Sequence, residues 1–168
     1  MTPEGNVKRF VPAPGNGAGA GRAPAPVDSP PSHEELLHFF IESPDLLCIA
    51  DFNGKFTRLN PAWQSALGWT LEELTSRPFL AFVHQDDRPA TLMEMDKLAM
   101  GALTITFENR YRCKDGSLRW LQWTARPLRD RGEIYAMARD VTRQKSLEEE
   151  ILRTLDYERE RVGRELHD

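Results

Sequence analysis

The last residues of this 168-residue chain have the types and the spacing that nucleophilic chemistry needs. The run Glu158-Arg-Glu-Arg-Val-Gly-Arg-Glu-Leu-His-Asp168 puts His167 at the end of a charged helical pattern, directly before Asp168. A carboxylate beside an imidazole can hold or accept one ring proton, which leaves the other ring nitrogen able to attack an electrophile. His167 is therefore the candidate nucleophile, and Asp168 is the candidate acid or base.

The same run closely resembles the phospho-acceptor box of one class of two-component sensor histidine kinases. The resemblance implies that His167 takes a phosphoryl group from ATP and passes it to an aspartate of a response regulator, while Asp168 orients the imidazole or takes its proton. The alternative is a polar helix end that happens to finish in His-Asp.

Two parts of such a kinase do not appear within the 168 residues. One is the glutamine that the family places four residues after the aspartate. The other is the ATP-binding domain, with its asparagine box and its glycine-rich lid. We therefore expect no activity from this chain alone. An ATP-binding kinase domain, in cis beyond residue 168 or in trans, would have to complete the enzyme.

The residues before His167 predict a long helix with one apolar stripe. Five apolar residues lie four, four, seven and four positions apart, and at about 100° per residue they stay on one side of the helix. The other sides carry charges of both signs. The stripe predicts a parallel coiled-coil homodimer with an eleven-residue repeat, and the alternative is a monomer whose helix folds back on its own domain. The stripe consists of Leu147, Ile151, Leu155, Val162 and Leu166.

The composition argues against several kinds of binding partner and against a membrane-spanning or secreted protein. A net charge of −4 and a pI near 5.6 give no electrostatic basis for binding nucleic acid or an anionic membrane. Cys48 and Cys113 occupy apolar positions, so we expect two reduced core thiols rather than a disulfide or a metal site. No run approaches the roughly 18 apolar residues of a membrane span, and the N-terminus lacks a signal-peptide core. A cytoplasmic protein is expected.

Residues 1–31 predict a disordered leader. They hold seven of the twelve prolines and five of the eleven glycines, with alanine between them. Such a segment cannot bury enough apolar surface to offset the entropy of ordering it. The domain division that we expect is a leader at 1–31, a folded domain at 32–142 and a helix at 143–168.

Local signals predict two helix starts and a hairpin in the first half of the folded domain. Ser32 and Glu35 have capping-box spacing, as do Thr70 and Glu73. Asn53-Gly54 lies between two apolar runs and predicts a hairpin with a type I′ turn, which needs positive φ at both central residues.

Two more helices are expected between these signals and the second half. One opens at Asn60-Pro61 and runs through Leu67 before a glycine. The other runs from about Arg88 to Met100 and would be capped by the side chain of Asp86 or Asp87.

The second half has the period of strands. Six residues that alternate with polar ones predict a half-buried strand with one solvated face: Leu103, Ile105, Phe107, Asn109, Tyr111 and Cys113. Two further strands are expected at 118–128 and 133–141, after which Thr142 can cap the terminal helix. The element order predicts an α+β fold with an antiparallel sheet.

Four segments of this order resemble a PAS domain. They read SPDLLCIADFNGKFTRLNPAWQSALGWTLEEL, FVHQDD, YRCKDGSLRWLQW and ARDVT, and the match spans about Leu36 to Thr142. The resemblance implies a five-stranded antiparallel sheet that wraps short helices, and a role as a sensor or dimerisation module. Asp140-Val-Thr142 resembles the motif through which PAS domains connect to an output helix and pass it their signal. We call Asp140 and Thr142 the hand-over residues.

Seven aromatic residues could line a cavity for an unknown aromatic or apolar small molecule, although ordinary core and dimer-face positions explain them equally well: Phe52, Phe56, Trp63, Trp69, Phe107, Trp120 and Trp123. Flavin photochemistry of the kind known in the family is disfavoured because residues 74–79 contain no cysteine. Haem is disfavoured because residues 88–100 contain no axial histidine. A capping role in the loop is expected for His84.

These observations favour the sensory input portion of a two-component histidine kinase, in which a cytoplasmic signal reaches His167 through the terminal helix. The alternative is a free-standing PAS adaptor that binds protein partners and is never phosphorylated. A haem- or flavin-based sensor is a third, weaker option.

Overall fold

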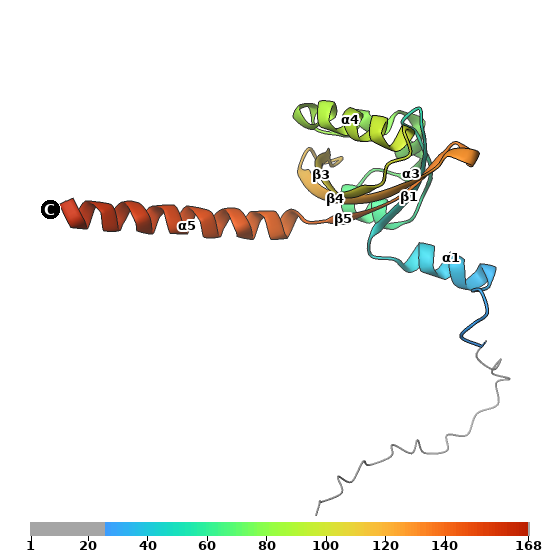
Figure 1. The fold of residues 1–168 in the computed structure, drawn as a ribbon, viewed down its shortest axis with the longest axis horizontal. Coiled ribbons are helices and arrows are strands. Elements are labelled where there is room, and N and C mark those ends of the chain that lie inside the picture. The colour runs from blue at the N-terminus through green and yellow to red at the C-terminus, as the bar shows by residue number, and fades with distance from the viewer. Residues whose placement is uncertain (1–25, 168) are drawn as a thin grey trace, which may run out of the picture. The chain divides into compact units, whose positions relative to one another are not determined.

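The computed structural model describes residues 26–167, and within them five strands form one antiparallel sheet (Figure 1). The strands lie in the order β2-β1-β5-β4-β3. Their bounds are β1 Leu46–Asp51, β2 Phe56–Leu59, β3 Thr104–Arg112, β4 Leu118–Leu128 and β5 Glu133–Asp140. The predicted α+β fold is confirmed.

Within residues 26–167, five α-helices and three short 3₁₀ turns accompany the sheet. The helices are α1 His33–Glu42, α2 Ala62–Leu67, α3 Leu71–Ser76, α4 Arg88–Ala99 and α5 Thr142–His167, and the 3₁₀ turns are Phe79–Ala81, Gln85–Asp87 and Arg129–Arg131. Most of the predicted leader (1–25) and Asp168 lie outside the described residues.

Both predicted capping boxes are present. The Ser32 hydroxyl accepts from the Glu35 amide at 3.2 Å, and the Glu35 carboxylate accepts from the Ser32 amide at 2.6 Å. Thr70 and Glu73 repeat this exchange at 3.1 and 2.8 Å. Such reciprocal bonds satisfy amides that a helix start leaves without partners.

The β1–β2 hairpin forms as predicted, but its turn is not type I′. Only Gly54 in the turn has a positive φ, of 84°. The Asp51 carboxylate accepts from the amides of Asn53 and Lys55, at 2.9 and 3.0 Å. This local side-chain bonding supports a longer loop, so the two-residue turn that Asn-Gly suggests is not needed.

The predicted side-chain cap of α4 is absent, because Asp87 binds elsewhere. Asp87 occupies the N-cap position of α4 without a side-chain cap bond. Its carboxylate instead accepts from the Arg110 amide at 2.7 Å and from the Arg110 guanidinium at 2.9 and 2.7 Å. Three hydrogen bonds from Arg110, two of them from its charged guanidinium, outweigh the single bond that the Asp87 carboxylate would accept as a helix cap.

A bulge at the start of β3 interrupts the alternation that the sequence predicts. Thr106 is an extra residue between the pairs Ile105–Thr124 and Phe107–Trp123, and it has a φ of 57°. Before the bulge the faces are exchanged, so that Thr104 is buried and Ile105 is 69% exposed. Beyond it, Asn109 and Tyr111 face inward as predicted. The inward assignment of Leu103 and Ile105 is therefore wrong.

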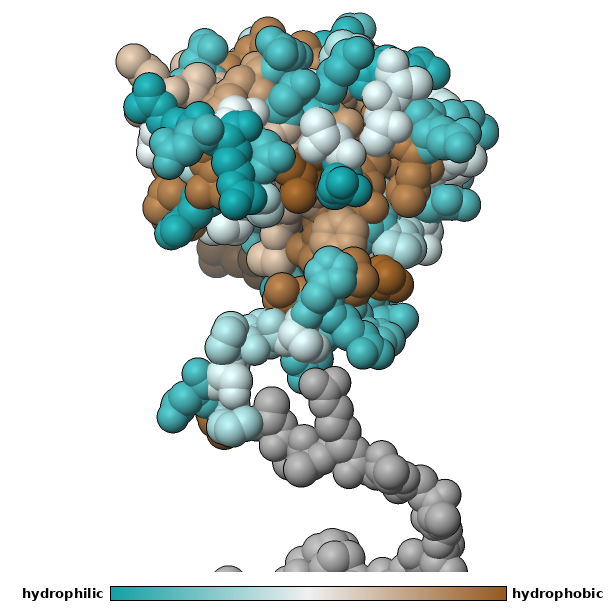
Figure 2. Space-filling view, turned by 90° about the vertical axis from the view of Figure 1, so that its right-hand side faces the viewer, coloured by the Kyte–Doolittle hydropathy of each residue, from teal (hydrophilic) through white to brown (hydrophobic). Residues whose placement is uncertain are grey.

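The core lies between one face of the sheet and the helices α2, α3 and α4. Its largest buried side chains include Trp63 from α2, Leu74 from α3 and Tyr111 from β3. Cys48 and Cys113 are buried free thiols, as expected. The helices α1 and α5 contain no buried residue. Hydrophobic side chains also reach the surface, beside hydrophilic ones, on the face shown in Figure 2.

Candidate functional site

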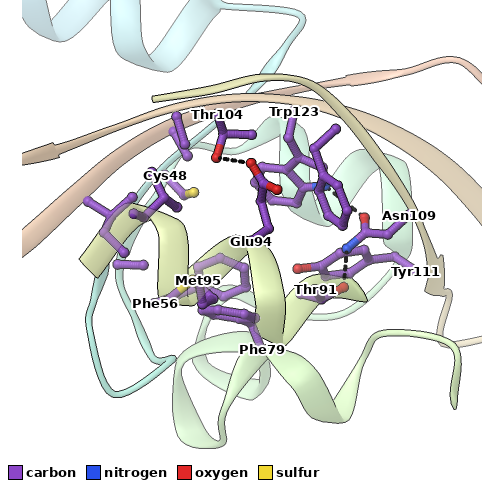
Figure 3. Close-up of a pocket in the computed structure, with 16 residues that line it drawn as sticks. Cys48, Phe56, Phe79, Thr91, Glu94, Met95, Thr104, Asn109, Tyr111 and Trp123 are labelled. Atoms are coloured by element: carbon purple, nitrogen blue, oxygen red, sulfur yellow. Dashed lines mark hydrogen bonds between the residues drawn. The ribbon is translucent and has the colours of Figure 1, made fainter. Parts of the chain in front are cut away.

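A cavity of about 60 Å³ lies in the core, between the inner face of the sheet and α4 (Figure 3). Most of its wall is apolar, and the residues that matter below are Ala50, Phe56, Phe79, Met95, Leu98 and Ile134. A void of this volume is large enough for water or a small molecule. The fold therefore leaves a site in the core that a ligand can occupy without unfolding the domain.

One part of the cavity wall is a satisfied polar network. The Asn109 amide donates to the Thr91 hydroxyl at 3.1 Å, and its carbonyl accepts from the Trp123 indole at 2.7 Å. Thr91 in turn donates to the main-chain carbonyl of Asp87 at 2.8 Å. Because each buried polar atom has a partner, this network holds β3, β4 and α4 in a fixed arrangement.

A carboxylate from α4 forms a second polar part of the wall. Glu94 accepts from the Thr104 hydroxyl at 2.8 Å and from the Lys97 ammonium at 3.2 Å. The exchange of faces at the β3 bulge brings Thr104 inward to meet Glu94. The cavity wall thus contains a negatively charged acceptor at one end.

Two further groups in the wall have no hydrogen-bond partner within the described part of the chain. These are the Tyr111 hydroxyl and the Cys48 thiol, which Figure 3 shows pointing into the cavity. Tyr111 is 1% exposed. Burial raises the pKa of both groups well above their usual range, and the nearby Cys48 adds to the rise at Tyr111. Both groups therefore remain protonated near neutral pH.

Three of the seven aromatic residues named from the sequence line this cavity: Phe56, Phe107 and Trp123. Trp63 is fully buried, with its ring 4.8 Å from that of Phe56 and its indole nitrogen 3.0 Å from the Leu47 carbonyl. Trp63 therefore supports the cavity wall without being part of it.

The other three aromatic residues lie elsewhere. Phe52 packs against a small cluster around Leu98 and Ile134. The Trp69 ring lies 5.4 Å from that of Phe82. Trp120 is on β4 beside the start of α5 and is described below.

Sequence reasoning did not single out Glu94, Thr104, Asn109 or Tyr111 as site residues. Asn109 carried a usable signal, since it is a polar residue at an inward position of an alternating strand. Thr104 carried none, because only the bulge turns it inward.

The predicted hand-over residues join β5, β4 and α5. The Thr142 hydroxyl accepts from the Trp120 amide at 2.9 Å and donates to the Asp140 carboxylate at 2.5 Å. Asp140 also accepts from the Thr142 amide at 3.0 Å, and the Arg119 guanidinium lies 3.6 Å away. The first turn of α5 is thus bonded to the strand that carries Trp120.

A cluster of charges around Trp120 adds a second attachment of α5. Lys145 forms an ion pair with Glu108 of β3, which raises the lysine pKa and lowers the glutamate pKa. The Lys145 ammonium lies 5.0 Å from the Trp120 ring centre, and the Arg110 guanidinium lies 5.1 Å from it. We call Glu108, Arg110, Trp120 and Lys145 the β3–α5 cluster.

His167 is the last described residue of α5 and is exposed. The helix runs without a break from Thr142, about 39 Å for its 26 residues. The five residues of the apolar stripe are all between 46% and 81% exposed. The structure thus connects Asp140 and Thr142, the predicted hand-over residues, to His167 through one helix whose apolar side has no partner within residues 26–167.

Residues 40–146 match the family described as PAS fold. The chain belongs to this family. No curated protein matches it. Among solved structures, this PAS domain is similar to a domain of the sensory box sensor histidine kinase/response regulator from Geobacter sulfurreducens. The TM-score is 0.57 at 23% identity, over 64% of this chain and 92% of that one.

Two other solved PAS domains share the fold. The PAS domain of an HTR-like protein from Haloarcula marismortui is 22% identical, with a TM-score of 0.56 over 64% of this chain and 95% of that one. The PAS domain of a protein from Colwellia psychrerythraea is 18% identical, with a TM-score of 0.56 over 66% of this chain and 97% of that one. Identities this low support the fold and do not identify a ligand or a partner.

The cavity of this PAS domain does not fit a haem or a flavin. Sites for ligands of that size measure about 300–1,000 Å³, and no residue of this cavity wall is a histidine. In residues 26–167, no cluster of His, Cys, Asp or Glu could hold a metal ion. Over the same residues, no helix has both the length and the apolar composition needed to cross a bilayer.

Proposed function

We propose that this chain is the sensory input portion of a two-component signal-transduction histidine kinase. In this proposal the PAS domain detects a cytoplasmic signal, α5 carries the response, and His167 is the phospho-acceptor. A response regulator receives the phosphoryl group, and an ATP-binding kinase domain acts in cis beyond residue 168 or in trans. Asp168, by the resemblance of its box, orients the imidazole of His167 or takes its proton.

The observation that carries the proposal is the unbroken helix between the sheet and His167. Thr142 begins α5 with hydrogen bonds to both β4 and Asp140, and no described residue before His167 interrupts the helix. A stiff connection of this kind can convert a small change in the sheet into a tilt or rotation at its far end.

The β3–α5 cluster supplies a contiguous route from the cavity to this helix. Asn109 faces the cavity, while its neighbours Glu108 and Arg110 face the opposite side of β3. There Glu108 binds Lys145, and Arg110 lies against Trp120. A shift of β3 that follows a change in the cavity would therefore alter the contacts that hold the first turn of α5. In this proposal the signal shifts the population between two arrangements of α5 against the sheet.

The acceptor role is tested by adding an ATP-binding domain of a matching kinase in trans with labelled ATP. We expect label on the wild-type chain and none on His167→Gln. Arg153→Gln, a change in the same helix outside the run from Glu158 to Asp168, serves as the control and should keep its label. Label on His167→Gln, or none on either protein, would refute the acceptor assignment.

The hand-over is tested in the same assay with Thr142→Val and Asp140→Asn. Each substitution removes bonds between α5 and the sheet while leaving His167 in place, so we expect the labelling rate to change by at least threefold. Thr154→Val is the matched control, because its hydroxyl bonds only to the Glu150 carbonyl of its own helix. Wild-type labelling rates in both hand-over variants would show that α5 is not coupled through these residues.

A free-standing adaptor is the second candidate function. It is favoured by the outer face of the sheet, where a groove is lined by apolar residues including Leu103, Ile105, Tyr135 and Met137. An exposed apolar surface of this kind is typical of a protein-binding face. The adaptor predicts that no phosphoryl group reaches His167 under any condition, so the labelling assay separates the two functions.

A further inference from the structure

We infer that the cavity binds a small uncharged alcohol, whose hydroxyl group meets Tyr111 and Glu94 and whose carbon chain lies on the apolar wall. This inference names the ligand class of the proposed sensor. It is argued from the size, the polarity and the unsatisfied groups of the cavity.

The first step is the unsatisfied hydroxyl of Tyr111. Among residues 26–167, every fully occluded side-chain nitrogen or oxygen has a hydrogen-bond partner. The Tyr111 hydroxyl has no protein partner, so it must face the void, as Figure 3 shows. A buried hydroxyl without a partner costs stability, and a ligand that supplies one recovers it. A phenol can donate and accept, so it accommodates a ligand hydroxyl.

The second step is the carboxylate that Glu94 contributes to the same cavity wall. Glu94 offers carboxylate oxygens that only accept hydrogen bonds when ionised. Its negative charge opposes a ligand carboxylate or phosphate, and Lys97 already pairs with it, which reduces its attraction for a ligand cation. A neutral ligand that donates to Glu94 and accepts from Tyr111 satisfies both groups. An alcohol does this with one oxygen atom.

The third step is size. An engineered apolar cavity of about 150 Å³ holds benzene, whereas this cavity measures about 60 Å³. The ligand is therefore smaller than benzene, with roughly two to four carbon atoms by this comparison. Ala50, Phe56, Phe79 and Met95 provide the apolar surface for such a chain, and the flexible thioether of Met95 can adapt to its shape.

The test is a titration of the 168-residue chain followed by amide NMR, with 2-propanol, acetone, acetate and xenon as separate probes. Xenon reports the void alone, because it forms no hydrogen bond. We expect saturable shifts around the cavity with 2-propanol, weaker binding of acetone, which cannot donate to Glu94, and no binding of acetate.

Tyr111→Phe is the decisive variant, since it removes only the hydroxyl. We expect its affinity for 2-propanol to fall by about three- to tenfold, while its affinity for xenon stays the same. A second variant, Ala50→Val, fills the void and should lose both probes. Equal 2-propanol binding by the wild type and Tyr111→Phe would overturn the inference. So would xenon binding alone, acetone or acetate binding as tightly as 2-propanol, or no binding of any probe.

This titration contains no kinase and no ATP, so its outcome is independent of the labelling of His167. Alcohol binding without label would retain the ligand class and reject the kinase. Label on His167 without alcohol binding would support the kinase proposal and reject the ligand class.

Discussion

Two polar side chains of β3, Asn109 and Tyr111, face the same cavity but differ in their bonding. Asn109 binds Thr91 and Trp123, whereas the Tyr111 hydroxyl has no partner among the described residues. We therefore expect opposite effects of apolar substitution. Asn109→Leu leaves the Trp123 indole unpaired and should lower the free energy of unfolding by about 1–3 kcal/mol. Tyr111→Phe should leave it unchanged or raise it by up to about 1 kcal/mol. Urea unfolding followed by circular dichroism measures both, and a larger loss in Tyr111→Phe would contradict the bonding described here.

The Asp87–Arg110 pair predicts a pH-dependent contribution to stability. Hydrogen bonds from Arg110 hold the pKa of Asp87 below its usual range. A depressed carboxyl pKa contributes stability that is complete above the unfolded-state value of about 3.9 and disappears as pH falls through the folded-state value. Asp87→Asn should thus cost about 1–3 kcal/mol at pH 7, and the cost should shrink as the pH is lowered below about 4.

Urea unfolding of wild type and Asp87→Asn between pH 2 and pH 7 measures this dependence. The neighbouring carboxylate provides the control: Asp86 is 67% exposed and lies 3.8 Å from the His84 ring. Asp86→Asn should change stability by less than about 0.5 kcal/mol at every pH. A pH-independent cost of Asp87→Asn would mean that the pair acts through packing rather than charge.

Among the elements, the β3 bulge decides which residues reach the cavity. Thr106 is a β-branched residue at a φ of 57°, which is strained for its side chain. Thr106→Gly should therefore raise the free energy of unfolding by about 0.5–1 kcal/mol. Thr124→Gly is the matched control, because Thr124 pairs with Ile105 in the regular part of β4. This substitution should lower the free energy of unfolding by about 0.5–1 kcal/mol. Thermal unfolding distinguishes the two, and destabilisation by Thr106→Gly would show that the strain is small.

Comparison of the predicted and observed elements shows which parts of the fold can be predicted from the sequence. The capping boxes at Ser32 and Thr70 and the strand at 118–128 follow from residues close together in the chain, and all were predicted. The missing cap at Asp87 depends on Arg110, 23 positions away. The inward position of Thr104 depends on one extra residue in β3. The cavity depends on both β3 and α4, so its polar residues could not be selected from spacing alone.

At the scale of the whole molecule, the cavity and the start of α5 are linked by three consecutive residues of β3. Asn109 contacts the cavity, and Glu108 and Arg110 belong to the β3–α5 cluster, which contacts α5 through Lys145. Both ends of this link are strand or helix residues with defined partners. This arrangement gives the proposed signal a physical path that does not require a flexible loop.

The apolar stripe of α5 predicts that the molecule is a dimer in solution. Ile151 and Leu155 are each 60% exposed within the single chain, and burying them against a second copy would remove their apolar surface from water. Ile151→Ala with Leu155→Ala should weaken dimerisation by at least tenfold, because each truncation is made in both copies. Arg153→Ala, on the opposite side of the same helix, is the control and should have little effect, since its exposed ion pair with Glu149 contributes little. Sedimentation equilibrium of the three proteins measures the dissociation constants. A monomeric wild type would favour a helix that folds back on its own domain, and equal constants for all three would assign the dimer to another surface, such as the outer face of the sheet.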